Sequence, residues 1–326
     1  MRLNTLAAAL GLAGLVATAG AVKAQDYPSR PITMIVPFAA GGPTDTVARL
    51  ISQSMSKTLG QQVVVENVGG AGGTLGAGRM AKADPDGYTV LLHHIGMATQ
   101  ATLYRKLPYK LPDDFAGVGL VTDVPMTIVA RKDFPAKDLK ELITYVRANK
   151  DKVTLANAGV GAASHLCGML FMSGIEVSLT TVPYKGTGPA MNDLAAGQVD
   201  LMCDQTTNTT GQIKGGAIKV YAVTSKNRIP SLPDVPTTAE AGAPNVQVGI
   251  WHGLYAPKNT PAPVIAKLEG ALQAALKDDT VKARFADLGT EPEPMDRATP
   301  AALNAYLKAE IDRWAPVIKA AGVYAD

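Results

Sequence analysis

One stretch of the sequence, residues 31–55, constrains the fold of this chain more than any other. Residues 32–36 form a short apolar, β-branched run that is typical of a buried strand, and a glycine-rich turn follows. Apolar residues then recur at the three- and four-residue spacing of an amphipathic helix, namely Val47, Leu50, Ile51 and Met55. The stretch therefore predicts a strand, a turn and a helix in an α/β fold.

The turn at residues 41–45 predicts an anion site. Backbone N–H groups at a helix start have no intrahelical acceptor and lie at the positive end of the helix dipole, which suits a carboxylate or phosphate. Thr44 or Asp45 offers a side-chain oxygen for capping that helix. The alternative is that Asp45 fills the anion site itself.

The first residues of the chain resemble an export signal. Arg2 gives a positive start, residues 6–21 are apolar, and residues 22–24 (VKA) have the small-x-small pattern of a cleavage site. We expect residues 1–24 to be a signal peptide that is cut after Ala24. The apolar run is short for a membrane span and no later window matches it, so we expect the mature chain in the periplasm and not embedded in a membrane.

Charge and length narrow the class of protein. The chain has 31 basic and 28 acidic residues, and loss of Arg2 and Lys23 with the signal leaves 29 and 28. A near-neutral balance does not favour nucleic acid as a partner. The roughly 300 residues that follow the signal exceed the usual size of one core, so two domains are expected.

A second strand, glycine loop and helix start repeats the first design. Residues 153–157 read as a strand, residues 158–165 as a loop and residues 166–172 as a helix. Free N–H groups are expected here too, and Ser164 could cap the helix or donate its hydroxyl to a ligand.

Polar residues follow three further predicted strands. His94 and Met97 come after residues 88–92, a Lys-Gly-Thr segment at residues 185–187 comes after residues 176–182, and Asp204 comes after residues 199–203. Open α/β sheets hold ligands at the carboxyl ends of their strands, so these are candidate wall residues. Lys185 could instead be solvated, and Asp204 could bind an amino group or cap the next helix.

Cys167 and Cys203 are the only cysteines. An oxidising periplasm permits a disulfide between them, and two buried free thiols are the alternative. The four histidines show no metal-ligand spacing, so neither a metal nor another cofactor is expected.

Several segments in this order resemble the extracytoplasmic solute receptors of tripartite tricarboxylate transporters, the Bordetella uptake gene (Bug, TctC-like) family. They are VPFAAGGPTDTVARL, ENVGGAGGTLGAG, DGYTVLL, GAASHL, VPYKGTGPAMNDLAAGQVD, LPDVPTTAEAG and GIWHGLYAP. The resemblance implies a two-lobed, type II-like periplasmic binding fold, each lobe a sheet flanked by helices. We expect residues 25–124 and 226–326 to form one lobe, residues 125–225 to form the other, and two crossover strands to act as a hinge.

The resemblance also implies how a ligand is held. Similar receptors bind a carboxylate largely through main-chain N–H groups and short hydroxyls, so the expected ligand is a dicarboxylate, a tricarboxylate or an acidic amino acid. The expected binding residues are Phe38, Ala39, Gly42, Thr44, Asp45, His94, Met97, Ala158, Gly161, Ala163, Ser164, His165, Lys185, Gly186, Thr187 and Asp204.

The expected function is delivery of that ligand to membrane transporter subunits by a monomeric, non-enzymatic receptor. A soluble sensor for a membrane signalling partner is one alternative. A hydrolase that uses Ser164 and His165 is another, although neighbours at a helix start point in different directions and no GxSxG elbow is present.

Overall fold

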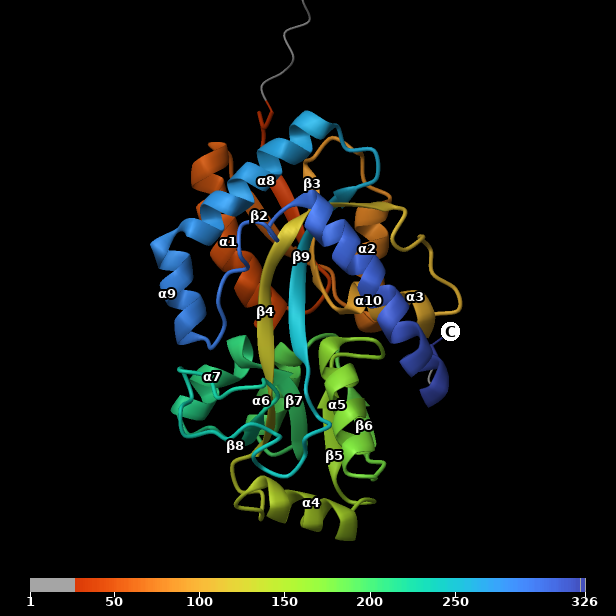
Figure 1. Cartoon of the computed structure of the whole chain (residues 1–326), viewed down its shortest axis with the longest axis vertical. Helices are drawn as coiled ribbons and strands as arrows, with labels where there is room; N and C mark the ends of the chain where they lie inside the picture. The colour runs from red at the N-terminus through yellow and green to blue at the C-terminus, as the bar shows by residue number, and fades with distance from the viewer. Residues whose placement is uncertain (1–26, 323, 326) are drawn as a thin grey trace, which may run out of the picture.

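The computed structural model describes residues 27–322, 324 and 325, so the expected signal peptide at residues 1–24 and its cut after Ala24 lie outside the described residues. The described chain is an α/β protein with two lobes, one above the other in Figure 1. Lobe 1 is the half that holds β1, β2 and β3, and lobe 2 is the half that holds β5, β6, β7 and β8. The predicted architecture is therefore confirmed.

The sheet of lobe 1 is covered on both faces. Its strands run in the order β2 (Val63–Asn67), β1 (Ile32–Val36), β3 (Thr89–His94), β9 (Gly249–Pro257) and β4 (Phe115–Arg131). The first three are parallel, and β9 is antiparallel to both of its neighbours. Met34 belongs to the apolar cluster of α1 (Pro43–Leu59) and α8 (Ala262–Lys277), whereas Ile35 belongs to the cluster of α10 (Pro300–Ala321).

The sheet of lobe 2 repeats this plan. Its strands run in the order β4, β7 (Leu201–Gln205), β5 (Thr154–Asn157) and β6 (Thr180–Pro183), and β8 (Ile218–Val223) also pairs with β4. The strands β7, β5 and β6 are parallel, whereas β4 is antiparallel to β7 and β8. Their carboxyl ends, like those of β1 and β3, lie toward the opposite lobe (Figure 1).

The strand β4 belongs to both lobes. Its residues 115–125 pair with β9 in lobe 1, and its residues 126–131 pair with β7 and β8 in lobe 2. Residues 118–123 and 126–130 therefore belong to one long strand that crosses between the lobes.

The position of the return crossing depends on which lobe residues 226–248 contact. Residues 226–248 contact lobe 2: Thr238 donates its backbone N–H to the carbonyl of Val223, and an apolar cluster joins Ile229, Leu232 and Val235 to Val223. We therefore propose that β9 is the return crossover and that lobe 2 spans residues 126–248, in place of a boundary near residue 226.

The remaining helices flank the two sheets. They are α2 (Thr74–Ala81), α3 (Gly96–Leu103), α4 (Leu139–Ala148), α5 (Ala163–Gly174), α6 (Thr187–Ala195), α7 (Thr206–Lys214) and α9 (Asp279–Asp287), with a short 3-10 turn η1 at Ala71–Gly73. None of the described helices has both the length and the apolar composition that a membrane span requires.

Two helix starts differ from the sequence prediction. Gly42 is the N-cap of α1 and Ala162 is the N-cap of α5, and neither helix has a side-chain cap. The prediction that Thr44 or Asp45 caps the first helix is therefore wrong, and so is the capping alternative for Ser164. Proline explains the first case, since Pro43 needs no N–H partner at the first helical position.

Candidate ligand-binding site

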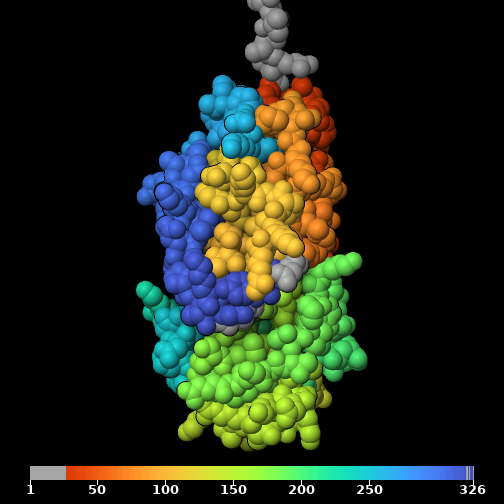
Figure 2. Space-filling view, turned by 90° about the vertical axis from the view of Figure 1, so that its right-hand side faces the viewer, coloured from red at the N-terminus to blue at the C-terminus, as the bar shows by residue number. Residues whose placement is uncertain are grey.

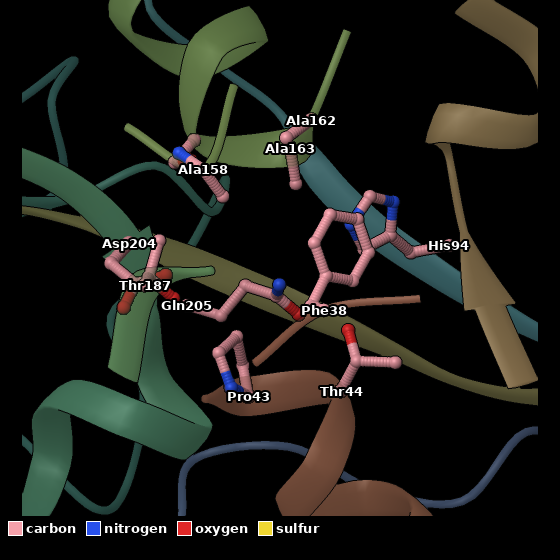
Figure 3. Close-up of a pocket in the computed structure, with 11 residues that line it drawn as sticks. Phe38, Pro43, Thr44, His94, Ala158, Ala162, Ala163, Thr187, Asp204 and Gln205 are labelled. Carbon is pink, nitrogen blue, oxygen red and sulfur yellow. The ribbon is translucent and has the colours of Figure 1, made fainter. Parts of the chain in front are cut away.

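Four helices begin at one pocket between the lobes. They are α1 from lobe 1 and α5, α6 and α7 from lobe 2. Figure 3 shows Pro43, Ala163 and Thr187, the first residues of α1, α5 and α6, and Gln205, the N-cap of α7, around the same space. The pocket contains about 250 Å³ not occupied by atoms, counting open solvent at its mouth. Its walls are formed by Phe38, Pro43, Thr44, His94, Ala158, Ala162, Ala163, Ser164, Thr187, Asp204 and Gln205.

The helix starts give the pocket a positive character without any cationic side chain. The first amides of a helix have no intrahelical acceptor, and none of these four helices has a side-chain cap. Each helix dipole also places roughly half a positive charge at its N-terminus. No lysine or arginine is among the lining residues. The arrangement suits a small anion.

Two neutral side chains add hydrogen-bond donors. The Ser164 hydroxyl oxygen accepts the backbone N–H of Ala158 at 2.9 Å, which leaves the hydroxyl hydrogen free to donate. His94 Nδ1 accepts the backbone N–H of Gly96 at 3.0 Å, so we assign its ring hydrogen to Nε2. Burial lowers the pKa of His94 well below its usual value, and the neighbouring histidines lower it further. The ring is therefore a neutral donor.

An aromatic cluster forms the wall behind these donors. Phe38 stacks on His94 with ring centroids 4.7 Å apart, and His252 meets His94 edge-on at 5.8 Å. His252 Nδ1 donates to the carbonyl of Ile250, so its Nε2 accepts the hydroxyl of Thr44 at 3.3 Å. Burial lowers the pKa of His252 to about 4. This wall is uncharged at neutral pH.

Asp204 is the charged residue of the pocket. It lies at the end of β7 and is 1% exposed. Its Oδ2 accepts from the side-chain amide of Asn208. Burial raises the pKa of Asp204 to about 6, against the opposing hydrogen bonds from Asn208, the backbone of Gln205 and the side chain of Thr187.

The two lobes touch around the pocket, and Figure 2 shows orange and yellow segments of lobe 1 against green segments of lobe 2. The backbone N–H of Ala39 donates to the carbonyl of Lys185 at 3.0 Å, and the hydroxyl of Tyr104 donates to the carbonyl of Val160 at 2.8 Å. Gly186 permits this approach, because a Cβ there would lie 2.7 Å from the nitrogen of Ala39. The pocket is therefore closed by both lobes.

The structure brings half of the residues expected from the sequence into the pocket wall. These are Phe38, Thr44, His94, Ala158, Ala163, Ser164, Thr187 and Asp204. The others lie outside its lining: Ala39, Gly42, Asp45, Met97, Gly161, His165, Lys185 and Gly186.

Asp45 is directed toward its own loop. Its Oδ2 accepts the backbone N–H of Gly41 at 3.0 Å and the Nε of Arg49 at 2.9 Å, and its Oδ1 accepts the side-chain amide of Asn67 at 2.9 Å. Burial favours a higher pKa for Asp45, but these hydrogen bonds outweigh it and lower the pKa. Asp45 therefore stabilises the turn. This agrees in part with the alternative that Asp45 itself fills the anion site, since it accepts the backbone N–H of Gly41.

Other expected residues shape the surroundings of the pocket. His165 Nδ1 accepts the backbone N–H of Gly161 at 3.4 Å, and Gly161 has the left-handed φ of +82° that favours glycine. Met97 is fully buried, and Lys185 is exposed. The exposure of Lys185 agrees with the alternative that this side chain is solvated.

Three lining residues were not among those expected. Pro43, Ala162 and Gln205 lie at the starts of α1, α5 and α7. For Gln205 the sequence carried a signal, because it follows Asp204 at the carboxyl end of a predicted strand. Pro43 is the first residue of α1 and Ala162 is the N-cap of α5, and both contribute apolar surface to the pocket wall.

The two cysteines form a disulfide, with Cα atoms 5.9 Å apart. Cys167 lies one helical turn after Ser164 in α5, and Cys203 immediately precedes Asp204 in β7. The bridge therefore ties together two elements that each supply a wall of the pocket.

The described residues show neither a metal centre nor a serine–histidine pair. In this part of the chain no three His, Cys, Asp or Glu side chains are grouped so that they could hold a metal ion. The hydroxyl of Ser164 bonds to Ala158, and the ring of His165 bonds to Gly161, so these neighbours are not hydrogen-bonded to each other. A nucleophile needs a base within hydrogen-bond reach.

Two lobes joined by long strands, with a pocket of helix N-termini between them, define a two-lobed periplasmic binding protein. The chain belongs to the tripartite tricarboxylate transporter family receptor (TctC) family, whose model matches residues 47–323. This is a family of solute-binding receptors and not a family of enzymes.

Two curated relatives cover most of the chain. The UPF0065 protein in the TAR-I ttuE-ttuC' intergenic region of Agrobacterium vitis is 59% identical over 92% of this chain and 87% of its own length. The protein BugT of Bordetella pertussis is 36% identical over 99% of each chain.

Solved structures share the fold. The periplasmic binding protein BugD is 55% identical, with a TM-score of 0.89 over 92% of this chain and 100% of its own. MatC from Rhodopseudomonas palustris, with bound malate, is 46% identical, with a TM-score of 0.85 over 90% and 100%. Rpa4515 from R. palustris, with adipate, is 34% identical, with a TM-score of 0.86 over 92% and 99%.

Proposed function

We propose that this protein is a periplasmic receptor that captures a small organic carboxylate between its lobes and delivers it to the membrane subunits of a tripartite tricarboxylate transporter. In this proposal the chain acts as a monomer, is exported by residues 1–24, and releases its ligand chemically unchanged. The family and the two similar proteins that hold malate and adipate support this assignment.

One observation carries the proposal, namely the convergence of four uncapped helix N-termini on one closed pocket. A hydrogen bond to a charged group contributes about 1.5–3 kcal/mol, so a few such donors are enough to hold a small acid. The pocket lining contains no lysine or arginine, and its residues Phe38 and His94 add uncharged aromatic surface. The small space suits a compact ligand. Carboxylate capture is what this geometry does best.

A thermal-shift screen of the mature protein tests the proposal. The panel contains C4 to C6 dicarboxylates, citrate, acidic amino acids and aromatic acids, each at saturating concentration. A bound acid stabilises the folded state by mass action and raises the melting temperature. The matched control is the amide of each hit, in which every carboxylate is replaced by a neutral carboxamide, and it should give no shift. Failure of every acid to shift the melting temperature would contradict the proposal.

The partner is tested separately. Tagged protein with and without a hit ligand is used to capture proteins from solubilised membranes, and ligand-dependent recovery of transporter subunits is expected. Recovery of a membrane kinase alone would favour a sensor. Incubation with the hit ligand, followed by mass spectrometry, should return the ligand unaltered.

A further inference from the structure

Two glycines of lobe 2 lie against the backbone of lobe 1 beside the pocket. A Cβ at Gly186 would lie 2.7 Å from the backbone nitrogen of Ala39. A Cβ at Gly188 would lie 2.6 Å from the backbone oxygen of Ala40. Real Cβ atoms almost never come within 3.0 Å of another heavy atom, and backbone cannot move aside as the end of a flexible side chain can. A methyl group at either position would therefore force the two lobes apart.

Lobe 2 itself does not require glycine at these two positions. Gly186 has an extended backbone with a φ of 165°, which any residue adopts, and the φ of Gly188 lies outside the left-handed region. Gly188 is in the first turn of α6, where glycine is a weaker helix former than alanine. Apart from chain neighbours and its own helix, the three atoms nearest to each added Cβ all belong to residues 39–42 of lobe 1. The close approach of lobe 1 is therefore the physical reason for both glycines.

A main-chain hydrogen bond joins the same two segments. The backbone N–H of Ala39 donates to the carbonyl of Lys185 at 3.0 Å, whereas the side chain of Lys185 is exposed. Neither residues 39–42 nor the two glycines are among the lining residues, but Thr187, which stands between the glycines, is one of them (Figure 3). The contact between the lobes therefore lies next to the ligand space without being part of its wall.

We propose that Gly186 and Gly188 are positioning residues that control ligand binding through closure of the lobes, without touching the ligand. Only glycine lets the two segments meet, and closure brings lining residues of both lobes around one space. A protein whose binding-competent state is only partly populated binds with an affinity reduced by that fraction. This inference rests on the proposed carboxylate receptor. It assigns Gly186 and the carbonyl of Lys185, both expected from the sequence to bind ligand, to the contact between the lobes.

The test compares Gly188→Ala with a matched control, Gly211→Ala. Gly211 lies in α7 of the same lobe, its φ is also outside the left-handed region, and a Cβ there would meet no atom within 4 Å. Affinities for succinate, L-malate, adipate and citrate are measured by isothermal titration calorimetry. We expect Gly188→Ala to bind the tightest of these acids at least tenfold more weakly than the unmodified protein does, with a similar ligand-free melting temperature. Gly211→Ala should keep the unmodified affinity.

Small-angle X-ray scattering separates closure from the loss of a ligand contact. With each protein saturated by the same acid, Gly188→Ala should have a larger radius of gyration than the unmodified protein and Gly211→Ala. A loss of affinity with an unchanged radius of gyration would make the glycine a ligand contact and contradict the inference. Lys185→Ala keeps the carbonyl that accepts the N–H of Ala39, so it should bind like the unmodified protein. A tenfold loss in Lys185→Ala would instead assign a ligand contact to the lysine side chain.

A second variant, Gly186→Ala, repeats the test so that the result does not depend on one position. Unmodified affinity and radius of gyration in both alanine variants would overturn the role of these glycines in closure and leave the carboxylate receptor intact. Loss of the cooperative melting transition in both would assign the glycines to the folding of lobe 2, which also overturns the inference. Failure of the unmodified protein to bind any of the four acids would contradict the receptor and, with it, this inference.

Discussion

The hydroxyl oxygen of Ser164 accepts the backbone N–H of Ala158 at 2.9 Å, which joins the start of α5 to the end of β5 and leaves the hydroxyl hydrogen free to donate. Ser164→Ala removes this donor and leaves the amide of Ala158 without its acceptor. Because a bond to a charged group contributes about 1.5–3 kcal/mol, we expect ligand affinity to fall roughly tenfold to hundredfold in calorimetry. Ser173→Ala, at the exposed end of the same helix, is the matched control. Unchanged affinity in Ser164→Ala would remove this hydroxyl from the site.

The contact between Tyr104 and Val160 should set how long a ligand stays bound. The Tyr104 hydroxyl lies 2.8 Å from the carbonyl of Val160 across the lobes. The same hydroxyl lies 2.7 Å from the carbonyl of Ala71 in lobe 1, so Tyr104→Phe removes a contact within lobe 1 together with the contact across the lobes. Only the contact with Val160 depends on closure, so stopped-flow measurements should show faster dissociation, by no more than the several-fold that loss of a neutral bond of about 0.5–1.5 kcal/mol implies. Tyr184→Phe breaks a bond to Asp193 inside lobe 2 and should not change the dissociation rate of the ligand. The same dissociation rate in Tyr104→Phe and the unmodified protein would argue against a role in closure.

Burial of Asp204 should make the ligand-free protein less stable as pH rises. Its folded-state pKa is about 6 against an ordinary 3.8, so the folded protein binds the proton more tightly than the unfolded chain does. That contribution is fully present below pH 4 and is lost as pH rises through 6, by at most about 3 kcal/mol.

The measurement compares melting temperatures of the unmodified protein and Asp204→Asn between pH 4.5 and 7.5. Asparagine does not titrate, so the unmodified protein should gain several degrees relative to the variant at the acidic end. The comparison is needed because the buried histidines act in the opposite direction: their lowered pKa values remove stability as pH falls below about 6.5. Parallel pH profiles for the two proteins would contradict the raised pKa of Asp204.

The disulfide between Cys167 and Cys203 should support both stability and binding. Intact protein should be two hydrogens lighter than its reduced form, and no thiol should react with iodoacetamide before reduction. Loss of a native disulfide typically costs about 2–5 kcal/mol, so the double variant Cys167→Ala and Cys203→Ala should melt at a lower temperature. It should also bind ligand more weakly, because α5 and β7 each line the pocket. Two reactive thiols in the untreated protein would show that the bridge is absent.

The sequence predicts those parts of the fold that depend on local patterns. The strand, glycine turn and helix at residues 31–55 are recognisable because apolar spacing and turn residues agree there. The sequence indicates α7 only as the helix that Asp204 could cap, because its threonine-rich sequence has low helix propensity and its burial against β4 and β7 decides its structure. The helix α3 is buried around most of its surface, so it lacks the one-sided stripe that reveals a helix.

The residues of the candidate site also divide into those that local sequence patterns predict and those that depend on tertiary structure. His94 and Asp204 could be predicted because they stand at the carboxyl ends of strands, where α/β proteins bind ligands, and Ser164 because it stands at a helix start that follows a glycine loop. The direction in which a side chain points could not be predicted from the sequence. Asp45 has the composition of a binding residue, but contacts with Gly41 and Asn67, which are set by tertiary structure, turn it toward its own loop. Lobe boundaries likewise depend on which lobe residues 226–248 pack against.

A crystal structure of the mature protein with the tightest-binding acid from the screen tests the central claim most directly. We expect one carboxylate within hydrogen-bond distance of the first-turn amides of α1 and α5 and of the Ser164 hydroxyl, with no lysine or arginine in contact with it. An acid bound outside this pocket, or held inside it by a cationic side chain, would contradict the account.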